Sequence, residues 1–166
     1  PPYRKALLGE DPDDAPINRA YRINGVTFLM ADSSIPGRNP GLLDDPTLAW
    51  LDRELAGDDG PAFVCFHHPP VPLHMPFVDE IRLERPDGLA AVVERHPRVV
   101  AVLCGHAHTP AATTFAGRPL LVAPGVASTV KLPWEPGPTL DRDFPPAIAF
   151  HLLDDGRLTT HFRLLA

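Results

Sequence analysis

The fold is decided by the stretch Val99-Val100-Ala101-Val102-Leu103-Cys104-Gly105-His106-Ala107-His108, an apolar run that ends in two histidines. A second apolar run, Ala62–Phe66, ends in the same way at His67-His68-Pro69-Pro70. Short apolar runs bounded by turn residues are typical of buried strands. Parallel strands present their carboxyl ends at one edge of a sheet, where open α/β proteins bind ligands. The sequence therefore predicts a metal site built from these histidines.

The hydrophobic pattern on either side predicts a mixed α/β fold. Asp45-Pro46 is typical of a helix N-cap followed by proline, and Gly57 suits the C-cap. A second helix is predicted over 86–95, and Asn24-Gly25 predicts a tight hairpin turn. The predicted strands cover 20–24, 26–32, 62–66, 99–104, 111–115, 119–123, 147–153 and 158–164. We therefore expect a sheet that is partly parallel, two main helices and C-terminal antiparallel hairpins.

Composition narrows the function classes. The 166 residues carry a net charge of −6, with 44% hydrophobic and 22% charged residues, as expected for one globular domain. No apolar run approaches the roughly 20 residues of a membrane span, and no signal peptide is visible. No Lys/Arg cluster favours a nucleic-acid or membrane partner. Cys65 and Cys104 are interpreted as small buried residues in a reducing compartment, which predicts a cytoplasmic protein; metal ligands or a disulfide between neighbouring strands are the alternatives.

The histidines next to the apolar runs differ in their expected roles. His106 and His108 would share a face on a straight strand, but at a strand end they can point toward two different ions. Pro69 favours an extended His68, so His67 and His68 should point in opposite directions. We predict that His67 is the metal ligand and that His68 supports the site or is structural. The reverse assignment is the main alternative.

The remaining histidines carry weaker expectations. His74 lies in the loop after the first histidine pair and could reach a leaving group or substrate, although exposed loop histidines are common. We therefore name it, with His68, as a candidate that supports the site without binding the ion. Structural or exposed positions are expected for His96, His151 and His161.

Taken together, Phe66-His67-His68-Pro69-Pro70 and Cys104-Gly105-His106-Ala107-His108 resemble the last two motifs of the calcineurin-like metallophosphoesterases. The similarity is greatest to the branch of class III cyclic-nucleotide phosphodiesterases and glycerophosphodiesterases. That branch has segments similar to Ile81-Arg82-Leu83, to Phe115–Leu121 and to Asp154–Leu158. The resemblance covers most of residues 20–166.

This resemblance implies a fold, a metal centre and a reaction. The family fold is an αββα sandwich with two divalent ions, Mn, Fe or Zn, between the strand ends. His67 and His106 would bind one ion and His108 the other. The ions, about 3.5–4 Å apart, would hold a small phosphodiester while a metal-bridging hydroxide attacks phosphorus. The implied activity is phosphodiester hydrolysis, with 3′,5′-cyclic nucleotides as the expected substrates and glycerophosphodiesters or aryl phosphodiesters as alternatives.

The chain departs from the family at its other motifs. Asp-x-His, the Gly-Asp motif with a bridging aspartate and Gly-Asn-His-Asp/Glu are missing, and Asp32 is followed by Ser33-Ser34. We therefore expect residues 1–166 to be the C-terminal portion of a single metallophosphoesterase domain, with 1–19 as an irregular lead-in and 20–166 as the core. Without an anionic bridge this chain should hold no ion or one, against two in the intact enzyme, and should show little catalysis. An uncovered strand edge would favour a homo-oligomer.

Two other functions remain open on the sequence. One is a non-catalytic scaffold or interaction domain that keeps half the fold. The other is a mononuclear zinc site with three histidine ligands. The number of ions per chain distinguishes them. The segments 71–83 and 131–146 are the expected walls of a substrate site.

Overall fold

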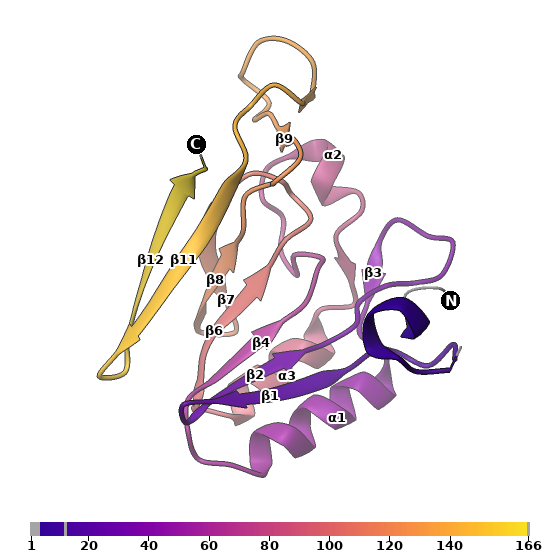
Figure 1. The fold of residues 1–166 in the computed structure, drawn as a ribbon, viewed down its shortest axis with the longest axis vertical. Coiled ribbons are helices and arrows are strands. Elements are labelled where there is room, and N and C mark those ends of the chain that lie inside the picture. Colours follow the sequence, from indigo (N-terminus) through magenta and orange to yellow (C-terminus); the bar gives the residue numbers. More distant parts are fainter. Residues whose placement is uncertain (1–3, 12, 166) are drawn as a thin grey trace.

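The computed structural model describes residues 4–11 and 13–165, so part of the predicted lead-in (1–3 and 12) and the last residue of the predicted core (166) lie outside it. Its centre is a mixed six-stranded sheet in the order β1-β2-β4-β6-β8-β7 (Figure 1). The strands are β1 (Arg19–Ile23), β2 (Val26–Met30), β4 (Ala62–Cys65), β6 (Val99–Cys104), β8 (Arg118–Val122) and β7 (Ala111–Phe115). Strands β2, β4, β6 and β8 run parallel, and β1 and β7 pair antiparallel at the two edges. The predicted partly parallel sheet is confirmed.

Two-residue turns close the hairpins. Asn24-Gly25, Ala116-Gly117 and Asp155-Gly156 all have positive φ at both residues, with values between 47° and 78°. Such turns match the twist of the flanking strands, and asparagine, aspartate and glycine reach positive φ at low cost. The third turn joins β11 (Ala147–Asp154) to β12 (Arg157–Leu164), a separate two-stranded ribbon. The predicted C-terminal hairpin is confirmed.

Two helices cover one face of the sheet. α1 (Asp45–Ala56) buries Leu51 and Leu55, and α3 (Asp87–Arg95) buries Leu89, Val92 and Val93, which recur at helical spacing. Both helices contribute to one core with the sheet (Figure 1). The predicted N-cap is wrong by one position: Asp44 caps α1 by accepting from the Thr47 amide, because Asp45 already has helical backbone. A further short helix, α2 (Pro76–Asp79), was not predicted.

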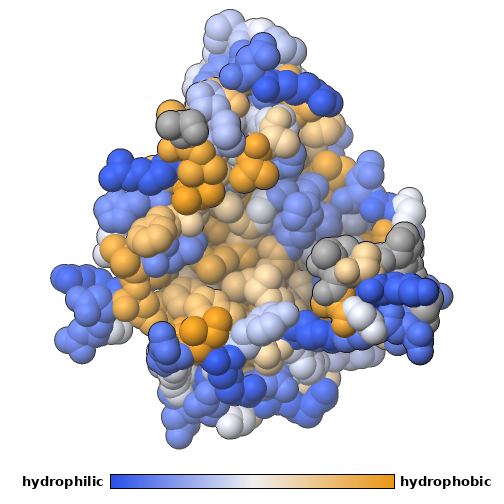
Figure 2. All heavy atoms as spheres, viewed as in Figure 1, coloured by the Kyte–Doolittle hydropathy of each residue, from blue (hydrophilic) through white to orange (hydrophobic). Residues whose placement is uncertain are grey.

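The opposite face of the sheet is open and apolar. Figure 2 shows a hollowed hydrophobic surface at the centre of the view, over this sheet. Phe63, Cys65 and Ala101 form a small cluster there, flanked by Phe28 and other apolar side chains. The ribbon β11–β12 stands beside it and covers only part of it (Figure 1). An apolar sheet face of this kind is typical of a surface that another layer covers.

The two cysteines lie on opposite faces of the sheet. Cys65 belongs to the open-face cluster, whereas Cys104 belongs to the core under the helices. Both thiols are free, so the alternative of a disulfide is not realised. Burial raises the pKa of the Cys65 thiol to about 12, which suits a packing residue rather than a reactive one.

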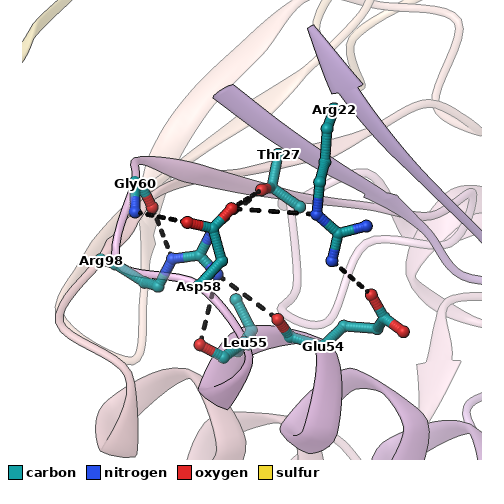
Figure 3. Close-up of polar contacts among 7 residues, drawn as sticks. All are labelled: Arg22, Thr27, Glu54, Leu55, Asp58, Gly60 and Arg98. Carbon is teal, nitrogen blue, oxygen red and sulfur yellow. Dashed lines mark hydrogen bonds and ion pairs between the residues drawn. The ribbon is translucent and has the colours of Figure 1, made fainter. Parts of the chain in front are cut away.

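A network of polar contacts joins the sheet to α1 at the end of the sheet that lies away from the histidines (Figure 3). Arg98 donates to the Leu55 carbonyl at 3.2 Å, to Thr27 Oγ1 at 3.0 Å and to the Gly60 carbonyl. Its guanidinium also lies 3.5 Å from the Asp58 carboxylate. One side chain therefore joins the C-terminus of α1 to β2 and to the segment that enters β4. A cation at a helix C-terminus is also favoured by the helix dipole.

Several short elements were not predicted. They are the helical turn η1 (Arg4–Leu8), β3 (Gly41–Leu42) paired with β5 (Leu83–Glu84), and β9 (Thr129–Val130) paired with β10 (Leu140–Asp141). Their strands have two residues each, too few for a hydrophobic period to identify. Within 4–11 and 13–165, no helix has the length and apolarity needed to cross a membrane. The cytoplasmic location stays a prediction.

Candidate metal centre

Four parallel strands end at the same edge of the sheet, and the loop after each carries a part of the candidate site. Ser33 follows β2, and the pair His67-His68 follows β4. His106 and His108 follow β6, and Ser128 follows β8. Because parallel strands point the same way, residues that are far apart in the chain meet at this edge.

His67 and His106 face each other across the ends of β4 and β6. His67 Nε2 lies 3.2 Å from His106 Nδ1, and the two rings are nearly perpendicular. Strand-like hydrogen bonding continues into the loops, since the Gly105 amide donates to the His67 carbonyl at 3.1 Å. His106 then turns away with φ +68°, in the left-handed region that costs energy for a residue with a side chain. The backbone is strained where the ring enters the site.

The donor set at this point fits a divalent cation. Two nitrogens each about 2.1 Å from one ion are about 3.0 Å apart in octahedral and about 3.4 Å apart in tetrahedral coordination, which brackets the 3.2 Å observed. In the structure this contact is a hydrogen bond between the two rings, and the other ring nitrogen of His106, Nε2, is buried without a hydrogen-bond partner among the described residues. Burial, reinforced by His68 and His67, lowers the pKa of His106 to about 4. The imidazole is therefore neutral at pH 7, the state that binds metals.

His68 lies beside this pair, but its ring is hydrogen-bonded to other residues. Ligand atoms of His67, His68 and His106 all lie within 4.8 Å of one another. The His68 ring is buried, with Nδ1 at 2.8 Å from Ser33 Oγ and Nε2 at 3.1 Å from the Asn39 carbonyl. Both of its nitrogens already have partners in the protein. Its pKa is lowered by burial and then by His67.

His108 and His74 lie outside the group of three. His108 Nδ1 contacts Ser128 Oγ at 2.8 Å, and its backbone has φ +53°. Gly125 packs against it, since a Cβ on this glycine would lie 3.0 Å from His108 Cβ. His74 is exposed, with φ +60°, in the loop before α2. Of the three predicted ligands, the structure thus brings two together and points the third toward a different partner.

Sequence reasoning missed the two serines that contact the histidines. Ser33 and Ser128 are both buried, and each places its hydroxyl on an imidazole nitrogen. Buried serine is uncommon unless its hydroxyl is bonded, but nothing in the sequence indicates which serines are buried. In the sequence, Asp32-Ser33-Ser34 stands out only because it does not match a family motif. Its position at the carboxyl end of a predicted strand is the one feature that could have indicated that Ser33 lies in the site.

Comparisons with known proteins find relatives among the phosphodiesterases. A scan against protein-family models finds no match. Among curated proteins, a probable cyclic nucleotide phosphodiesterase of Rhodococcus erythropolis is 38% identical over 143 residues, which is 85% of this chain and 47% of that protein. A cAMP/cGMP dual specificity phosphodiesterase of Mycobacterium tuberculosis is 36% identical over 84% of this chain and 44% of its own length. The glycerophosphodiester phosphodiesterase GpdQ of Enterobacter lignolyticus is 36% identical over 74% of this chain and 44% of its own length.

Solved structures share the fold. A dimetal phosphatase of Danio rerio superposes with a TM-score of 0.56 at 18% identity, over 74% of this chain and 52% of that chain. GAP50, the anchor in the inner membrane complex of Plasmodium, superposes with a TM-score of 0.59 at 11% identity, over 90% of this chain and 50% of that chain. The resemblance to the calcineurin-like metallophosphoesterases is confirmed. The chain spans about half the length of the curated relatives it matches.

Proposed function

We propose that residues 1–166 form one portion of a larger metallophosphoesterase domain, and that the complete domain hydrolyses phosphodiesters. The substrate class that the relatives' names favour is the 3′,5′-cyclic nucleotides. The observation that carries the proposal is the pair of neutral imidazoles, His67 and His106, that converge at the ends of β4 and β6. Small phosphodiesters are anionic, and this acidic chain has no Lys/Arg cluster to attract them. Bound cations would supply the positive charge.

In this proposal each histidine has a defined task. His67 Nε2 and His106 Nδ1 hold one divalent ion, Mn, Fe or Zn, and His108 holds the second in the complete domain. Divalent ions bound there would polarise the phosphate oxygens and lower the pKa of the attacking water. The Ser128 hydroxyl fixes the His108 ring by its contact with Nδ1, which leaves Nε2 as the donor atom.

The open face of the sheet supports the idea of a larger domain. Phe63 and Cys65 are buried on this face, but Phe150 of β11 is 54% exposed and Met30 of β2 is 44% exposed. A second layer of the same domain would cover these side chains, as in a two-sheet sandwich. It would also supply anionic ligands, since the described residues of this site offer only neutral imidazoles.

The mononuclear alternative receives less support. A zinc site with three histidine ligands would need one ring nitrogen of His68, the third histidine of the group. Both ring nitrogens of His68 are already hydrogen-bonded, one to Ser33 and the other to Asn39. His108 does not belong to the group of histidines whose ligand atoms lie within 4.8 Å of one another among the described residues. Two histidines therefore remain for one ion.

The experiment has a binding arm and a hydrolysis arm. Calorimetry with Mn²⁺ or Co²⁺ on the 166-residue chain should give about one ion, lost in His106→Ala and retained in His161→Ala, an equivalent change at an exposed position on β12. Hydrolysis of cAMP with Mn²⁺ should appear when the remaining portion of the Rhodococcus erythropolis relative is supplied. Equal binding by His106→Ala and the parent chain would refute the ligand assignment. Binding without hydrolysis in the complemented protein would favour the scaffold function.

A further inference from the structure

Ser33 and His68 form a buried hydrogen-bonded pair directly behind His67. Ser33 is 2% exposed and His68 is 6% exposed. His68 Nε2 faces the Asn39 carbonyl at 3.1 Å, and because a carbonyl only accepts, Nε2 carries the proton. Nδ1 is then the acceptor, and it receives the Ser33 hydroxyl proton at 2.8 Å. The contacts of His68 define one neutral tautomer.

The Ser33 hydroxyl also reaches the backbone of the proposed ligand. The His67 amide donates to Ser33 Oγ at 3.3 Å. Since that hydroxyl donates its own proton to His68, the hydrogen bonds run in one direction from the His67 amide through Ser33 and His68 to the Asn39 carbonyl. Every donor in this series has an acceptor, so the series defines both the His67 backbone and the His68 ring.

Gly41 gives an independent observation on the same ring. A Cβ on Gly41 would lie 2.3 Å from His68 Nδ1 and 2.8 Å from His68 Cβ, closer than side chains can approach. Gly41 lies in β3 and does not have a positive φ, so its backbone alone does not require glycine. The close approach of the His68 ring does. Because Gly41 has no side chain, β3 can pack directly against the His68 ring and keep it in contact with Ser33.

We infer that Ser33, Gly41 and His68 are positioning residues: they fix the backbone of His67 so that its Nε2 is aimed at His106 Nδ1, and His68 itself binds no ion. The inference rests on the proposed metal centre for its purpose. It also explains why adjacent histidines have different surroundings. His67 is exposed and His68 is buried, although the centroids of their two rings lie only 4.8 Å apart. The opposite orientation expected from an extended backbone is therefore not found, because both rings lie on the side of His106.

The test compares Ser33→Ala with Ser34→Ala, which removes a hydroxyl from the adjacent, exposed serine. Co²⁺ affinity measured by calorimetry should fall about 10- to 100-fold in Ser33→Ala, the usual effect of removing a residue that orients a ligand. Ser34→Ala should stay within about 2-fold of the parent chain. Ser33→Thr, which keeps the hydroxyl, should recover most of the affinity, and Gly41→Ala should lose it by displacing the His68 ring. Circular dichroism of each variant is the control for folding.

A second readout needs no metal. Imidazole ¹⁵N spectra of the metal-free chain should show His68 protonated at Nε2 only. Ser33→Ala should keep this tautomer, because the Asn39 carbonyl still accepts from Nε2, but it should shift the His68 Nδ1 signal and the His67 amide signal. If His68 carries its proton on Nδ1, or if Ser33→Ala changes neither the His67 amide nor Co²⁺ affinity more than Ser34→Ala does, the positioning role is refuted. If the parent chain takes up no Co²⁺, the proposed centre fails, and the ¹⁵N measurements alone decide on the positioning role.

Discussion

Acid should destabilise the metal-free chain through His106. Its pKa in the folded chain is about 4, lowered by burial and by the neighbouring histidines, against about 6.5 when unfolded. Because the unfolded chain binds the proton more tightly, stability is complete above pH 6.5 and is lost as the pH falls from 6.5 toward 4. At pH 5 the difference between these two pKa values lowers the free energy of unfolding by at most about 2 kcal/mol. The ring is partly accessible, and solvent screening reduces this to about 1 kcal/mol.

The change that isolates this effect is His106→Asn. Asparagine does not titrate and tolerates the φ of +68° at this position. Urea unfolding with a chelator, at pH 7.5 and pH 5.0, gives the loss of unfolding free energy for each chain. The parent chain should lose about 1 kcal/mol more than His106→Asn, and His161→Asn, altered on the exposed ribbon, should behave like the parent. Equal losses in the parent and His106→Asn would show that the ring is not held in a neutral, desolvated state.

Three further predictions concern other parts of the structure. Arg98→Met should lower the unfolding free energy by about 3 kcal/mol, and thus the melting temperature by about 6–12 °C, because the partners in Figure 3 lose their donor; an unchanged melting curve would contradict this. Ser128→Ala should remove the hydroxyl partner of His108 Nδ1 and shift the Nδ1 signal in imidazole ¹⁵N spectra; an unchanged signal would refute the contact. Met30→Lys, on the open face, should reduce concentration-dependent self-association in sedimentation while changing stability by no more than about 0.5 kcal/mol; equal association by both chains would place the contact elsewhere.

The sequence predicted the parts of the fold that local patterns determine. The strand 99–104 and the strand 111–115 were placed at their observed bounds, and the helix over 86–95 differs by one residue at its start. These segments have strong apolar periods and clear terminating residues. The N-cap of α1 was misplaced because Asp44 and Asp45 are adjacent and only the backbone conformation distinguishes them. A sequence pattern alone cannot distinguish which of two adjacent aspartates is the N-cap.

The site was predictable only in outline. Two apolar strands ending in histidines indicated a metal site, and the family resemblance implied that His67 and His106 would bind one ion; the structure brings these two rings to 3.2 Å. The contacts that orient the histidines join residues 35 positions apart for Ser33 and His68, and 20 for His108 and Ser128. Such contacts depend on strand order and loop path, which a single sequence does not reveal. The assignment of the three metal ligands stays a prediction.

The order of the strands explains why the site forms where it does. β4 and β6 are neighbours in the middle of the sheet, so their loops cannot move apart without breaking the ladder on both sides. β2 and β8 flank them, and their loops bring one serine each to the outer sides of the histidines. The left-handed φ at His106 and His108 is costly for an isolated loop, but here the rings are anchored from neighbouring strands that are already fixed. Arg98 ties the other end of the same sheet to α1, so the strands that carry the histidines are held at both ends. A rigid frame of this kind keeps two neutral imidazoles close together before any cation arrives, which reduces the reorganisation needed to bind one.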